Sequence, residues 1–263
     1  MEYIKPTSDR KVRFYTTQQN SFGLLPGDPA TGGTCPGCTQ AEGGCWYLAK
    51  DRKTRTCYVD GLMGCYKGVR AILAHNTRIL KAADVEGKKR ILAAEFNRFE
   101  VAEAKRAARL KTSPHMRYRL HWSGDVFDAD YAEALAYAIR THPGIEFWTY
   151  TRSWDAIPWF CDLSNLTLYL SLDPVNVRDG VYAYLLNGGP ANPKLQLCYM
   201  GKTNDFHGLD AVTKTYAMFP AERQNRVRMA ACPVDTGNMK LEEGCSKCRR
   251  CISPGNGAVW FKT

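Results

Sequence analysis

The sequence predicts an α/β protein whose parallel strands alternate with helices, either as an open sheet or as a partial or complete (β/α) barrel. Its 263 residues, 44% of them hydrophobic, are enough for one large core. Strand, helix and strand follow one another at a cadence typical of right-handed parallel units. Alternating apolar and polar residues predict five strands, at 116–122, 145–150, 166–172, 195–200 and 226–231.

Two long helices are predicted before the first strand. Apolar residues recur at helical spacing from Val69 to Leu80, and again through the strongly charged stretch from Glu86 to Leu110. Between the first two strands, Asp128 is a suitable N-cap and Pro143-Gly144 ends the next helix. Shorter helices are expected at 154–161, 178–186 and 209–218.

One side of the predicted strands is unusually polar for a parallel sheet, whose strands are generally apolar on both faces. Either these strands lie at an edge and face solvent, or they line a polar cavity inside a barrel. The polar positions are Arg117, Arg119, His121, Thr167, Tyr169, Ser171, Arg226 and Arg228.

Eleven cysteines are too many for an ordinary cytosolic enzyme, and a reducing compartment disfavours a disulfide framework, so the cysteines indicate metal binding. Two of them, Cys161 and Cys198, lie in apolar segments and are expected to be small buried hydrophobic residues. No apolar run is long enough to cross a bilayer, and the chain has no apolar leader. We therefore expect a cytoplasmic protein without membrane association.

The most specific motif stands near the end of the chain. Cys245, Cys248 and Cys251 follow one another at Cys-x-x-Cys-x-x-Cys spacing, and Cys232 precedes a proline. Three closely spaced cysteines and a remote Cys-Pro are typical of a ferredoxin-like [4Fe–4S] site. Four cysteines also suit tetrahedral zinc, but structural zinc sites tend to pair two Cys-x-x-Cys hooks. We favour iron–sulfur and keep zinc as the alternative.

A second set of cysteines lies near the start of the chain, in a segment rich in glycine, proline and threonine. It comprises Cys35, Cys38, Cys45, Cys57 and Cys65. Five cysteines exceed the four that one site needs, so at least one of them is spare or serves elsewhere. Neighbouring aromatic residues either shield a cluster from water or are ordinary packing.

Polar residues follow the predicted strands, at the ends where α/β proteins gather their chemistry. Asp125 and Asp173 could accept hydrogen bonds from a substrate or a small ligand, and Arg152 and Lys202 could hold a carboxylate or phosphate. The alternative is that the two aspartates only cap the turns and helices that follow them. Asp125, Arg152 and Asp173 are the catalytic candidates, and the reaction is left open.

The sequence resembles the phage family named gene product 88. The matching stretches are Thr34 to Gly37, Cys45, Cys57-Tyr58, Val69 to Asn76, His121 to Asp125, Phe147 to Ser153, Ser171 to Asp173 and the final cysteine motif. By analogy with a related group of phage proteins, the resemblance implies a radical-SAM-like barrel with the early cysteines at its mouth. The spacing departs from the radical-SAM hook Cys-x-x-x-Cys-x-x-Cys, and Cys38 and Cys65 are additions to the family pattern.

The leading hypothesis is a phage-type iron–sulfur protein that works in the host cytoplasm with an unidentified small ligand or redox partner. We expect one or two [4Fe–4S] clusters bound by Cys35, Cys38, Cys45, Cys57, Cys232, Cys245, Cys248 and Cys251. A cysteine-rich segment, 1–66, and a cysteine hook, 232–263, flank a barrel-like domain, 67–231. Four ligands would saturate a cluster, so S-adenosylmethionine binding, as in an active radical-SAM enzyme, is not favoured.

The other alternative is a zinc- or cluster-stabilised module that binds nucleic acid. The net charge of +10 agrees with such a partner, but charges of both signs are interspersed along the basic helix, which is more typical of a solvated face. The basic residues of that helix are Lys88, Lys89, Arg90, Arg98, Lys105, Arg106 and Arg109.

Overall fold

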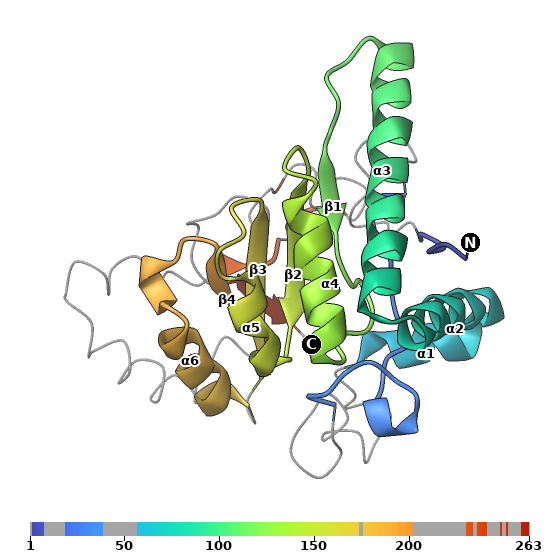
Figure 1. Ribbon diagram of the computed structural model, residues 1–263. Coiled ribbons are helices and arrows are strands. Elements are labelled where there is room, and N and C mark those ends of the chain that lie inside the picture. The colour runs from blue at the N-terminus through green and yellow to red at the C-terminus, as the bar shows by residue number, and fades with distance from the viewer. Residues whose placement is uncertain are drawn as a thin grey trace.

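A computed structural model shows a parallel sheet with helices packed against it (Figure 1). The structure describes residues 2–7, 19–38, 57–173, 176–201, 230–233, 236–240, 248, 251 and 259–262. The strands are β1 (Arg117–Arg119), β2 (Glu146–Thr151), β3 (Leu166–Leu172), β4 (Leu195–Gly201), β5 (Ala230–Ala231) and β6 (Val259–Lys262). Their order in the sheet is β1-β2-β3-β4-β6-β5, and every neighbouring pair is parallel.

The parallel α/β prediction is confirmed, whereas the described strands form an open sheet with β1 and β5 at its edges and do not close into a barrel. Beyond its pairing with β2, β1 has an isolated parallel bridge between Arg119 and Ser21. Strands β1 to β4 fall within the predicted segments or one residue past them, and β5 is the end of the predicted strand at 226–231, of which 226–229 lie outside the described residues. Strand β6 was not predicted. The division at residues 66 and 231 stays a prediction.

The predicted helices are confirmed where the structure describes them, and the 209–218 segment lies outside the described residues. Asp84 and Asp128 cap α3 and α4, each accepting a hydrogen bond of 2.7 Å from a backbone N–H of the first turn. No described helix is long and apolar enough to span a membrane. The α-helices are α1 (Tyr58–Cys65), α2 (Lys67–Ala82), α3 (Val85–Leu110), α4 (Ala129–Arg140), α5 (Ile157–Phe160) and α6 (Val177–Leu186). Short 3-10 helices are η2 (Pro29–Thr31), η4 (Trp154–Ala156) and η5 (Gly189–Ala191).

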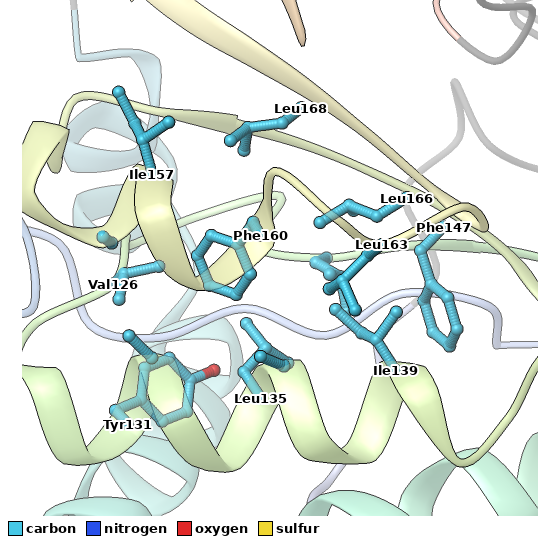
Figure 2. Close-up of a cluster of buried hydrophobic side chains, with 14 of the residues drawn as sticks. Val126, Tyr131, Leu135, Ile139, Phe147, Ile157, Phe160, Leu163, Leu166 and Leu168 are labelled. Carbon is cyan, nitrogen blue, oxygen red and sulfur yellow. The ribbon is translucent and has the colours of Figure 1, made fainter. Parts of the chain in front are cut away.

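The main core lies between the sheet and the helices α4 and α5, as Figure 2 shows. Tyr131, Leu135 and Ile139 line the buried side of α4 because their spacing places them on one helical stripe. The side chains of Phe160 and Leu166 meet this stripe from α5 and β3. Helical spacing therefore decides which side of α4 faces the sheet.

The opposite face of the sheet is also buried, and its composition is different. Trp148 and Tyr150 of β2, Tyr169 of β3 and Cys198 of β4 alternate with the residues that face the main core. Val259 of β6 packs against the last two. We call this surface the aromatic face. It includes the predicted polar positions Thr167, Tyr169 and Ser171, each at most 8% exposed, so the expectation of a solvent-facing edge is wrong there.

His121 does not belong to the polar side of the strands, contrary to the prediction. Strand β1 ends at Arg119, and the backbone of His121 has a φ of 51°, so the two-residue alternation stops before it. Its ring turns towards α4, where Nε2 lies 2.6 Å from the hydroxyl of Tyr131. Arg119, by contrast, places its guanidinium over the ring of Tyr150, 5.6 Å from the ring centroid.

Candidate functional site

The turns that follow β1 and β2 are tied together by Asp125. Its carboxylate accepts hydrogen bonds from the Thr151 hydroxyl, the Arg152 backbone N–H and the Val126 backbone N–H, at 2.7, 2.7 and 2.8 Å. Burial raises the pKa of this carboxyl above its ordinary value, and these hydrogen bonds oppose the rise. Because these three hydrogen bonds join the two turns, Asp125 is a clamp between two strand ends, and its catalytic role stays a prediction.

Arg152 and Asp173 connect the ends of β2 and β3. The Arg152 Nη1 atom lies 2.5 Å from Asp173 Oδ2, and both side chains are nearly fully buried. The other oxygen of Asp173 accepts the Asn176 backbone N–H at 3.0 Å, just before α6 begins. Of the two alternatives predicted for Asp173, the structure shows the turn cap, and a role in ligand binding stays a prediction. The three catalytic candidates therefore lie together, as predicted, but they bind one another.

The first cysteine loop lies at the same carboxyl ends of the strands. Cys35, Pro36, Gly37 and Cys38 form a tight turn in which the Cys38 N–H donates to the Cys35 carbonyl at 2.9 Å. Gly37 packs so closely on Arg152 that a Cβ at this position would lie 2.9 Å from the arginine Cβ. Close approach, and not a positive φ, is what requires glycine here. Figure 1 shows this blue segment beneath α1 and α2.

Two further hydrogen bonds hold this loop near the clamp. The Cys35 N–H donates to the Gly27 carbonyl at 2.8 Å, and the Asp125 N–H donates to the Thr34 hydroxyl at 3.3 Å. Cys38 is buried and Cys35 is half-buried. The structure therefore brings the loop predicted to bind a cluster to the predicted end of the sheet.

The remaining early cysteines differ in their surroundings. Cys57 packs beside Leu73 and Trp122, and Trp122 follows β1 at the same edge of the sheet. Cys65 is exposed at the end of α1, a helix that the sequence did not predict. Cys45 lies outside the described residues. Of the four predicted early ligands, three therefore lie in the part of the chain that the structure describes.

The late cysteines lie against the aromatic face. Cys251 packs against Trp148, and both Cys232 and Cys251 pack against the cluster of Tyr169, Cys198 and Val259. Cys232 follows β5 directly, and β5 pairs with β6. Cys248 is half-buried, whereas Cys245 lies outside the described residues. Within the described positions, no three His, Cys, Asp or Glu side chains are grouped closely enough to hold a metal ion.

Cys198 is a buried residue of the sheet, as predicted, and not a thiolate ligand. Burial raises the pKa of its thiol to about 12, so it stays protonated at neutral pH. A hydrogen bond with Ser171 and the charge of Arg152 oppose this rise. Cys161 is half-buried next to α5, 4.0 Å from the Asn187 carbonyl oxygen, where we expected full burial.

The basic helix α3 uses much of its charge within the protein. Four of its seven predicted basic residues form ion pairs, which are Lys88 with Asp130, Lys89 with Glu86 and Glu133, Arg98 with Glu95, and Arg106 with Glu103. Arg90, Lys105 and Arg109 are exposed. With Arg98, which is exposed but paired with Glu95, they make four exposed cations along 26 residues, a sparse surface for a polyanion.

Comparison with known proteins identifies the family. The family described as Gene product 88 matches residues 4–254. The "Gene 88 protein" of Mycobacterium phage D29 is 30% identical over 282 residues, and that of Mycobacterium phage L5 is 29% identical over 279 residues. Each alignment covers 100% of this chain and 99% of the phage protein. No solved structure matches the chain. The chain therefore belongs to the Gene product 88 family of phage proteins.

Proposed function

We propose that this protein binds iron–sulfur clusters through its two cysteine sets, of which the early one lies at the carboxyl end of β2 and the late one on the aromatic face. The observation that supports this most is that two segments from opposite ends of the chain, both rich in cysteine, pack against β2. Gly37, between Cys35 and Cys38, lies on Arg152, and Cys251 packs against Trp148 of β2. Ordinary packing does not need thiols there, whereas a cluster needs thiolates brought together from separate loops.

The chemistry of the donors favours iron–sulfur over zinc. The late set consists of three cysteines at Cys-x-x-Cys-x-x-Cys spacing and a remote Cys232-Pro233, which is a ferredoxin-like pattern. Cys232 and Cys251 of this set lie on a buried aromatic face, and an apolar shell that excludes water is one of the ways in which proteins tune a cluster. Zinc bound by the same four cysteines is the alternative that the experiment must separate.

We propose electron transfer or a structural role, and not cleavage of S-adenosylmethionine. A radical-SAM-like barrel remains part of this proposal only as an analogy from the family resemblance. Cys38 is placed in the same turn as Cys35 and could complete a four-thiolate set, which would leave no open iron. The nearby Asp125 and Asp173 accept hydrogen bonds from protein groups, so neither is positioned as a general base.

The direct test is anaerobic purification followed by iron, sulfide and zinc quantitation. Iron and sulfide in equal amounts, with a broad visible absorbance that bleaches on reduction by dithionite, would support the proposal. Stoichiometric zinc in a colourless protein would contradict it.

A pair of variants tests the late ligands. Cys248→Ser should lose the iron of one cluster and unfold at lower denaturant concentration, because metal-binding free energy contributes to folding. Cys161→Ser, which removes a sulfur close to Asn187 and the end of α5, is the matched control and should keep its iron. Equal iron in both variants would show that Cys248 is not a ligand.

A further inference from the structure

We infer that the early and late cysteine segments form one coupled metal-binding region, with the guanidinium of Arg152 between them. This inference rests on the proposed function for its metal, but the juxtaposition of the two segments is testable without it. On this inference the two clusters are not independent sites at opposite ends of the chain but neighbours on either side of one cation.

The first step is the geometry of β2. Side chains two residues apart along a strand point to the same face and lie about 7 Å apart. Trp148 and Tyr150 belong to the aromatic face, and Cys251 packs against Trp148. Arg152 is the first residue after β2, which ends at Thr151, and a Cβ on Gly37 would lie 2.9 Å from the Arg152 Cβ. The two cysteine segments therefore pack on β2 and on the residue that follows it, at positions four residues apart.

The second step is the direction of the Arg152 side chain. Its Nη1 atom lies 2.5 Å from Asp173 Oδ2, and Asp173 is two residues past Ser171, which is the register partner of Cys198 on the aromatic face. The same cluster contacts Cys232, the first cysteine of the late set. The guanidinium thus extends from the turn under Gly37 towards the strands on which the late cysteines lie.

The third step is electrostatic. Arg152 is 8% exposed and paired with Asp173, so its charge is fixed in place and weakly screened by solvent. Clusters with thiolate ligands carry negative charge, and reduction adds one more electron. A buried cation near both sets stabilises the reduced form of each. It also transmits a change at one set to the other, because moving either loop alters the contacts of Arg152.

Wild-type protein stripped of metal by a chelator, with its native fold checked by circular dichroism, tests the juxtaposition, because thiolates bound to a metal do not react with thiol reagents. A short bifunctional thiol reagent, followed by proteolysis and mass spectrometry, should join a peptide containing Cys38 to a peptide containing Cys251. Denatured protein treated in the same way should show this pair at the level of any other cysteine pair. If the native protein gives no enrichment, the two segments are not neighbours and the inference is wrong.

A variant series tests the coupling in protein that contains iron. Cys248→Ser/Cys251→Ser removes the late ligands, and the reduction midpoint of the early cluster is then compared with its wild-type value in a dithionite titration. A shifted midpoint is expected. An unchanged midpoint with unchanged early iron would overturn the coupling.

Arg152 itself is tested by two substitutions. Arg152→Gln should lower the midpoints of both clusters, whereas Arg152→Lys, which keeps the charge, should restore much of the loss. Arg140→Gln, which removes an exposed partner of Asp162 on α4, is the control and should leave both midpoints unchanged. Circular dichroism of each variant identifies any that fails to fold. If the wild-type protein contains no iron, the proposed function fails, while the cross-link still decides the juxtaposition.

Discussion

Protonation of His121 should make the fold sensitive to acid. The imidazole is 4% exposed, its Nε2 lies 2.6 Å from the Tyr131 hydroxyl, and the Phe22 ring meets it edge-on at a centroid distance of 5.3 Å. This burial lowers the pKa of His121 from 6.5 to about 3, because the charged form is costly in an apolar site. The folded protein therefore resists a proton that the unfolded chain accepts.

The direction and size of the effect follow from that difference. With a lowered pKa in the folded state, the stabilisation is complete above pH 6.5 and is lost as the pH falls towards 3. One pKa unit corresponds to about 1.4 kcal/mol, so the complete loss is about 5 kcal/mol, and the loss at pH 4 is about 3 kcal/mol.

The assay is urea unfolding of the wild type and His121→Asn at pH 7 and pH 4. Asparagine is chosen because it tolerates the φ of 51° at this position and does not titrate. The wild type should lose about 3 kcal/mol more than the variant between the two pH values. Carboxylates elsewhere titrate in both proteins and cancel in this difference. Equal losses would show that His121 is not buried as a neutral side chain.

Three other predictions concern packing, a buried acid and the early cluster. Gly180→Ala should lower the free energy of unfolding by about 1–3 kcal/mol, because a Cβ there would overlap Leu172, whereas Gly68→Ala has open space and should change it by less than about 1 kcal/mol in a urea titration. Burial raises the pKa of Glu95 to about 7, so the free energy of unfolding of the wild type should fall by about 3 kcal/mol between pH 4 and pH 9. Glu95→Gln should not show this fall. Reduced wild-type protein should form no 5′-deoxyadenosine from S-adenosylmethionine above a no-protein control. Gain of that activity in Cys38→Ala would confirm that Cys38 closes the cluster, whereas activity in the wild type would contradict it.

Local signals predicted the regular elements well, because caps and apolar periodicity act over a few residues. Asp128 begins α4, and a stripe with helical spacing buries the inner side of that helix. By contrast, the composition of α1 is typical of a loop. Glycines stand at positions 61 and 64 and no side chain caps the helix, so the sequence did not indicate a helix there. The four residues of β6 are too few for a clear alternation.

The order of the sheet could not be read from the sequence, because long-range pairing leaves no local signature. Strand β6 inserts between β4 and β5, although β5 precedes it in the chain. His121 shows a second kind of failure. Its place in the alternating pattern predicted one face, but the strand ends at Arg119 and the positive φ turns the ring to the other side.

The candidate site was predicted in its residues but not in their roles. Parallel topology alone brings Asp125, Arg152 and Asp173 to one edge of the sheet, since each directly follows a strand or its turn. Which partners they take depends on distances that the sequence does not contain. Asp125 accepts a hydrogen bond from the backbone of Arg152, and Asp173 accepts one from the Arg152 side chain. These hydrogen bonds hold the strand ends together.

Cysteine spacing predicts the kind of ligand, whereas the sheet decides where the ligands lie. The late set is attached at both ends to the sheet, because Cys232 follows β5 and Cys251 precedes β6, and these strands pair with each other. Strand β6 also pairs with β4, next to Cys198. The hydrogen bonds of the sheet thus return the end of the chain to the aromatic face. A metal bound by Cys232 and Cys251 would be held by residues that the sheet already positions, which would lower the entropy lost on binding.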